Sequence, residues 1–232
     1  TMIWPSMKHV LGSGIFWLVA IAHSGSSMAK SSVRIVGTYL ADTNKHNNSS
    51  QSDTAGLAVF LSIGTVMGLV IAGHFFTMQS DQARKRKWLV SKLYLTMIGS
   101  CYVLSILAIP AVAATLEDLL LFLQIFALFI LGFAISVPYY HLPSLVSANF
   151  PQHKALFLSL TEGVAYGIAG CLWRIVGRIV AAGEDGWAYG WATVALLIIL
   201  TAVLMVEFLE HYYCRPEQTG SDAAIYETIV FA

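Results

Sequence analysis

The sequence predicts an all-α membrane fold with six transmembrane helices. Hydrophobic residues make up 57% of the 232 residues and charged residues only 11%, whereas charged residues approach about a quarter of a soluble domain. Between Thr54 and Tyr212 the chain is almost entirely apolar, and its dense run of positive charge, Arg84-Lys85-Arg86-Lys87, falls between two apolar stretches. This pattern is typical of helices that cross a bilayer and are joined by polar turns.

Six stretches are long enough to span the hydrocarbon core, which requires about 20 apolar residues in a helix. The first is unusually long, and Lys30 and Arg34 interrupt its second half. The predicted spans cover residues 10–40, 54–78, 93–114, 119–146, 155–182 and 187–212. The bundle therefore occupies residues 1–215, and we expect residues 216–232 to form a disordered cytoplasmic tail.

The distribution of cations predicts the orientation. Six crossings leave both termini on one side of the membrane. The ends and loops on that side carry Lys8, the run from Arg84 to Lys87, Lys92, Lys154 and Arg215, whereas the opposite loops carry Lys45 and mostly acidic residues. Because cytoplasmic loops are enriched in Lys and Arg, we expect a multi-pass membrane protein with both termini in the cytoplasm.

Small residues recur at helical spacing in two of the spans. Gly64 and Gly68 share one helix face, and so do Gly163, Gly167 and Gly170. In a bilayer this spacing lets two helix backbones approach closely. Static packing is the favoured interpretation, and a sliding contact between transporter helices is the alternative.

Two prolines predict an irregular fourth span. Pro138 and Pro143 remove backbone donors and clash with the preceding turn, so the helix should bend or break there. The carbonyl groups released need a neighbouring side chain or water. Broken helices often border a cavity in transporters, although prolines are also frequent in ordinary membrane helices.

Four ionisable residues inside the spans are the candidate substrate-binding residues, because a charge within hydrocarbon is costly and usually functional. Lys30 and Arg34 are four residues apart on one helix face. There they can hold an anion, with Arg34 suited to a bidentate grip on phosphate or carboxylate. An equally weighted alternative is that the first span ends earlier and both cations extend to the outer interface.

Glu162 and His141 complete this candidate set. Glu162 lies about two turns into the fifth span and can carry a proton, although a bond to a neighbouring helix end is the favoured interpretation. His141 follows Pro138 and two tyrosines. It can titrate near neutral pH or donate to a substrate oxygen, although a packing role is favoured.

The remaining motifs give no support to an enzyme. The sequence contains no nucleophile elbow, no phosphate-binding loop and no metal-ligand spacing such as His-x-x-His or Cys-x-x-Cys. Cys101 and Cys171 lie within apolar spans and are predicted to be buried thiols. The zero net charge gives no indication of a nucleic-acid partner. We therefore expect neither catalysis nor a cofactor.

The long first span and the basic segment after the second span together resemble the C-terminal half of a major facilitator superfamily transporter. The segment Asp81-Gln82-Ala83-Arg84-Lys85-Arg86 resembles the acidic-then-basic loop motif of that family, although it lacks the internal glycine. Two six-helix halves enclose a central substrate path in such transporters. The resemblance implies one half-bundle whose partner is a missing N-terminal half or a second copy.

Within the superfamily, the chain is most similar to the sugar-phosphate and glycerol-3-phosphate exchangers. The similarity covers about residues 52–212. The matching motifs are Pro138-Tyr139 with Val146-Ser147-Ala148 for the tenth helix, Glu162-Gly163 with Gly167, Ala169 and Gly170 for the eleventh, and Gly186-Trp187 for the start of the twelfth.

This resemblance implies a secondary transporter, an antiporter, that moves a small organic anion by alternating access. A phosphate ester exchanged for phosphate is the implied example. The anion site of the family uses a basic residue on the first helix of each half, and Lys30 and Arg34 lie on the corresponding helix. The alternative is a six-helix membrane protein that transports nothing alone and acts as an assembly or receptor-like partner.

Overall fold

The computed structural model describes residues 3–44, 56–78, 82–148 and 150–211, and every regular element in these ranges is helical. The predicted tail, residues 216–232, lies outside them. The helices are α1 (Ile3–Gly12), α2 (Gly14–Ser31), α3 (Val33–Thr43), α5 (Val59–Met78), α6 (Ala83–Leu107), α7 (Pro110–Thr115), α8 (Glu117–Tyr140), α9 (Leu142–Ser147), the short 3-10 helix η2 (Pro151–His153), α10 (Lys154–Val180) and α11 (Gly186–Leu209).

The described residues contain several apolar helices that are compatible with a multi-pass membrane protein. Five stretches are long and apolar enough to cross a bilayer, and there are six if α1 and α2 are counted together as one bent span. The five are Val59–Met78, Ala83–Leu107, Asp118–Ser147, Pro151–Val180 and Gly186–Leu209. The all-α fold expected from the sequence is therefore confirmed, with five or six helices that could span a membrane by their length and composition.

The prediction of a single helix over residues 10–40 is wrong. Ser13 has an extended backbone (φ −79°, ψ 124°), and the helix before it is bent by 71° from α2. A slighter irregularity at Ser32 separates α2 from α3, although Ser32 keeps helical dihedrals (φ −58°, ψ −23°). Its hydroxyl donates to the carbonyl oxygen of Ala29 at 2.6 Å, and such local bonds compete with the helical ladder.

The third span is shifted relative to the prediction of residues 93–114. Helix α6 begins at Ala83, so the basic run forms its first turns rather than the loop before it. The helix ends at Leu107, and Pro110 starts the separate helix α7. Proline disfavours the α conformation of the residue before it, and Ile109 is indeed extended (φ −70°, ψ 123°).

The fourth span is irregular where the prolines predict it, although His141 keeps helical dihedrals (φ −94°, ψ −34°) and Asp118–Ser147 is still one candidate span. Pro138 lies in the last turn of α8, which ends at Tyr140, and Pro143 lies in the first turn of α9. His141 joins the two helices. The fifth and sixth predicted spans coincide with α10 and α11 to within a few residues.

Close approach of two backbones at Gly64 and Gly68 is also confirmed. A Cβ atom added to Gly64 would lie 2.0 Å from the carbonyl oxygen of Phe129 in α8, and one added to Gly68 would lie 2.4 Å from that of Phe133. Gly132 of α8 is equally close to α5. Only residues without a Cβ atom allow α5 and α8 to pack at this separation.

The second glycine face does not pack against other described residues of the bundle, so the two interpretations of its spacing stay predictions. Gly163, Gly167 and Gly170 are exposed, and an added Cβ atom would meet nothing within 4 Å among the described residues. Helix α10 turns its opposite side inward, where Ala165 and Ala169 are buried.

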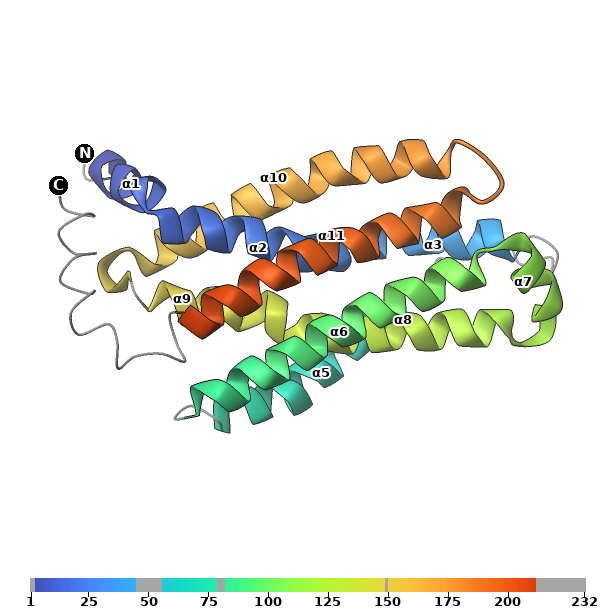
Figure 1. The fold of residues 1–232 in the computed structure, drawn as a ribbon, viewed down its shortest axis with the longest axis horizontal. Coiled ribbons are helices and arrows are strands. Elements are labelled where there is room, and N and C mark those ends of the chain that lie inside the picture. Colours follow the sequence, from blue (N-terminus) through green and yellow to red (C-terminus); the bar gives the residue numbers. More distant parts are fainter. Residues whose placement is uncertain (1–2, 45–55, 79–81, 149, 212–232) are drawn as a thin grey trace.

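The principal helix contacts repeat after every three spans (Figure 1). Helix α10 packs on α2 as α5 packs on α8, and α11 packs on α2 as α6 packs on α8. Helices α2 and α8 also touch each other, as do α6 and α11. The contact between α10 and α11 is the exception, since α5 and α6 form no equally extensive one. The chain thus consists of two successive three-helix units with similar contacts. The first unit is α2 with α5 and α6, and the second is α8 with α10 and α11.

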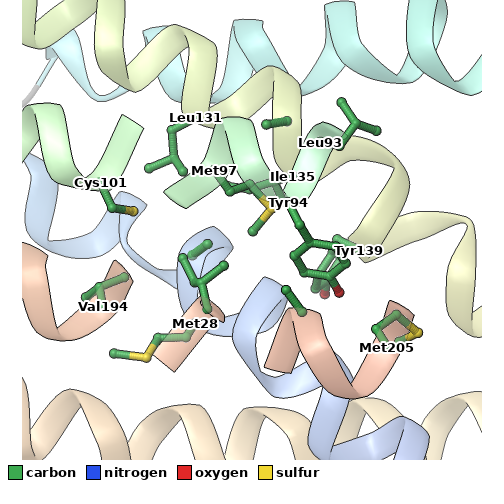
Figure 2. Packing of buried hydrophobic residues seen from close by; sticks show 14 of the residues in the cluster. Met28, Leu93, Tyr94, Met97, Cys101, Leu131, Ile135, Tyr139, Val194 and Met205 are labelled. Carbon is green, nitrogen blue, oxygen red and sulfur yellow. The ribbon is translucent and has the colours of Figure 1, made fainter. Parts of the chain in front are cut away.

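A continuous apolar core joins the two units (Figure 2). Met28 of α2, Met97 of α6, Ile135 of α8 and Val194 of α11 are all fully buried in it. Buried Cys101 agrees with the sequence prediction. The same prediction is wrong for Cys171, which is exposed because it lies on the outward side of α10.

Candidate substrate site

The Lys30 ammonium lies between two tyrosines of α8. Its Nζ atom is 4.2 Å from the ring centroid of Tyr139 and 4.0 Å from that of Tyr140. It also donates a hydrogen bond to the Tyr140 hydroxyl. Aromatic faces attract a cation through their quadrupole, so the two rings hold the half-buried ammonium against α8.

Tyr139 also connects this ammonium to α10. Its hydroxyl donates to Glu162 Oε2 at 3.2 Å and shares a hydrogen bond with the Tyr166 hydroxyl at 2.8 Å. The Glu162 carboxylate and the Lys30 ammonium interact electrostatically. The structure thus brings together two of the four predicted site residues, and α2, α8 and α10 each contribute to the cluster.

Two polar atoms of α2 extend this cluster. The His23 ring lies 5.1 Å from that of Tyr139, and its Nδ1 atom is 3.1 Å from Ser26 Oγ. The His23 Nε2 and Ser27 Oγ atoms are buried and have no hydrogen-bond partner within the described part of the chain. Buried polar atoms are usually hydrogen-bonded, so these two atoms are available to a polar ligand.

The helical positions on α2 show which way Ser27 faces. Lys30 and His23 point to α8, and Ser31 accepts a hydrogen bond of 2.7 Å from Trp173 Nε1 of α10. At 3.6 residues per turn, Ser27 lies in the sector between these two directions. It therefore faces the junction of α8 and α10, where Tyr139 meets Glu162.

The other two predicted site residues lie elsewhere. Arg34 is exposed on α3, beyond the irregularity at Ser32. His141 packs against α5, because its Nε2 atom is 2.8 Å from the Cβ position of Gly73 and its ring is 5.5 Å from that of Phe76. These contacts agree with the packing role favoured for His141.

Sequence reasoning missed the tyrosines of the site. Tyr139 and Tyr140 directly precede the irregular position in the fourth span, and Tyr166 lies one turn beyond Glu162. A pair of aromatic residues beside a proline inside an apolar span was the available signal. Glu162 has no cation at helical spacing in its own helix, and its electrostatic partner comes instead from α2.

Comparisons with protein families, with curated proteins and with solved structures find no match to this chain. Within the described ranges, no group of three His, Cys, Asp or Glu residues is placed to hold a metal ion. The fold and the site thus define an all-α protein with membrane-spanning helices and a polar cluster between α2, α8 and α10.

Proposed function

We propose that this chain is one six-helix half of a secondary transporter for a small organic anion, such as a phosphate ester exchanged for phosphate. The observation that carries this proposal is the half-buried Lys30 ammonium held against two tyrosines of α8. A cation within membrane-spanning helices is costly, and such residues commonly mark a substrate path.

The helix arrangement supports the same proposal. Many secondary transporters consist of inverted repeats and bind substrate where corresponding helices are interrupted. The first span of each half of the bundle has an irregular position, at Ser32 and at His141, although both residues keep helical dihedrals. The turns before these two positions carry Lys30, Tyr139 and Tyr140. An odd number of spans per unit makes the second unit inverted relative to the first.

In the proposed mechanism, the bundle rocks against a second six-helix half, which is another part of the protein or a second copy of the chain. Gly163, Gly167 and Gly170 of α10 lack Cβ atoms and meet no other described residue there, so a helix of the second half can approach this face closely. Lys30 binds the anion as a point charge. Arg34, about one turn further along, adds positive charge toward the end of the path.

Uptake of labelled glycerol phosphate and of labelled phosphate into vesicles that carry the full-length protein tests the proposal. Lys30→Ala should reduce uptake about tenfold or more, because a hydrogen bond to a charged group is lost. Lys92→Ala, which removes an exposed lysine of α6, is the matched control.

Two outcomes would contradict the proposal. Unchanged uptake after Lys30→Ala combined with Arg34→Ala would remove both residues from the site. Failure of the wild-type protein to transport either anion would favour the alternative, a six-helix protein that acts as an assembly or receptor-like partner.

A further inference from the structure

The positive charge that would bind a substrate already has a negative neighbour. The Tyr139 ring lies 4.2 Å from Lys30 Nζ, and its hydroxyl donates to Glu162 Oε2 at 3.2 Å. A single tyrosine side chain therefore connects the ammonium with the carboxylate, and the two charges interact. The Lys30 charge is thus partly compensated before any substrate binds.

The groups that can titrate around Glu162 form a short set. Helix α9 contains no titratable residue. In α11, Tyr189 and Glu207 lie near the two ends of the helix. The histidine of η2 lies beside His9, with 5.8 Å between the ring centroids. Lys30 of α2 and Tyr139 of α8 interact with Glu162. His23 of α2 and Tyr166 of α10 contact the same Tyr139 side chain.

An anion that approaches Lys30 also approaches the Glu162 carboxylate. Two like charges repel strongly inside a bundle, where the dielectric constant is far below that of water. A neutral Glu162 removes this repulsion and frees the whole Lys30 charge for the ligand. We propose that substrate anions bind together with a proton on Glu162, so that transport through this site is coupled to protons. This inference rests on the proposed transport function.

The hydrogen bonds at Glu162 are compatible with both states of its carboxyl group. When Glu162 is charged, the Tyr139 hydroxyl donates to it and accepts from Tyr166. When Glu162 carries a proton, the carboxyl O–H donates to the Tyr139 hydroxyl, which in turn donates to Tyr166. No bond is formed or broken apart from the transfer of one proton from water to Glu162.

This coupling has a quantitative consequence. If each anion binds with one proton, its apparent affinity should fall as the pH rises, by up to about tenfold for each pH unit. By the same linkage, the bound anion increases the affinity of Glu162 for a proton. The relationship holds for net uptake and for exchange, because it concerns the binding step.

The test measures KM for labelled phosphate and labelled glycerol phosphate across a range of pH, with full-length protein in proteoliposomes. Both anions titrate in solution, so wild type and variant are compared with the same anion at the same pH. Glu162→Gln keeps the side chain neutral at every pH. Glu184→Gln removes an exposed carboxylate between α10 and α11 and is the matched control.

At alkaline pH, Glu162→Gln should bind the anion more tightly than wild type, and the difference should grow by up to about tenfold for each pH unit. Structural damage would not produce this gain in affinity. The variant should also take up one proton fewer per anion. Parallel KM profiles for wild type and Glu162→Gln would overturn the inference and leave the transport proposal intact. Absence of transport by wild type would instead overturn the proposed function.

Tyr139→Phe provides a second test if Glu162→Gln does not fold. The carboxylate of Glu162 then loses a hydrogen-bond donor, which favours its neutral form, while the aromatic ring beside Lys30 remains. The pH profile of KM should therefore move to higher pH. An unchanged profile would also overturn the inference.

Discussion

A Cβ atom added to Gly64 of α5 would lie 2.0 Å from the backbone carbonyl oxygen of Phe129 in α8. The neighbouring atom is backbone and cannot rotate away. Gly64→Ala should therefore force the two helices apart and destabilise the protein by about 1–3 kcal/mol. Thermal unfolding in detergent measures this loss.

Gly99→Ala is the matched control for that substitution. Gly99 lies on the exposed side of α6, where an added Cβ atom would meet nothing within 4 Å. Alanine has the higher helix propensity, so this variant should be at least as stable as wild type. Equal destabilisation by the two substitutions would contradict the close packing of α5 on α8.

Gln124 connects α8 to the end of α3 through a buried hydrogen-bond network. Its Nε2 atom donates to Tyr39 Oη at 3.2 Å and to Thr43 Oγ1 at 2.9 Å, and its Oε1 atom accepts from Asn44 Nδ2 at 2.8 Å. Gln124→Ala should cost about 1–3 kcal/mol, because buried partners lose their hydrogen bonds. Chemical or thermal unfolding, with exposed Gln152→Ala as the control, checks this expectation.

Lys87 of α6 and Glu210 after α11 form an ion pair of 2.8 Å. Both side chains are partly exposed, so the pair should contribute about 0.2–1 kcal/mol. A double-mutant cycle with Lys87→Ala and Glu210→Ala, measured by thermal unfolding, gives this coupling directly. The coupling should decrease with added salt, and a coupling independent of salt would contradict a partly exposed pair.

The same ion pair brings the basic run and the end of α11 to one end of the bundle. With the positive-inside rule, Gln82 is then expected on the cytoplasmic side and Gly183 on the opposite side. Gln82→Cys and Gly183→Cys, each made in a protein whose three native cysteines are replaced by serine, test this orientation. In intact cells an impermeant thiol reagent should label only the Gly183→Cys variant. Labelling of both variants without permeabilisation would contradict the topology.

Some features could be predicted locally because their cause lies in one segment. A run of apolar residues is sufficient to predict a membrane-spanning helix, and the positions of α10 and α11 agree with that prediction. Pro138 and Pro143 act on their own helix, so the irregularity at His141 was predictable. The irregularity at Ser32 was missed, because a serine hydroxyl competes with the helical ladder only weakly and is common within helices.

Other features depend on which helices become neighbours. Glycines at the same spacing pack against a neighbouring backbone at Gly64 and meet no other described residue at Gly167. The spacing alone does not distinguish a packed glycine face from an open one. Lys30 and Arg34 are equivalent in the sequence pattern, yet only Lys30 meets the tyrosines of α8.

The sequence by itself determined the all-α fold, the number of its long spans to within one and the irregular position in the fourth span, since hydrocarbon length and proline geometry act locally. Only the tertiary structure decided that Lys30 and Glu162 share Tyr139. The Lys30 hydrogen bond to Tyr140 joins residues 110 positions apart, and no periodicity within one helix can predict a contact that depends on how three helices pack.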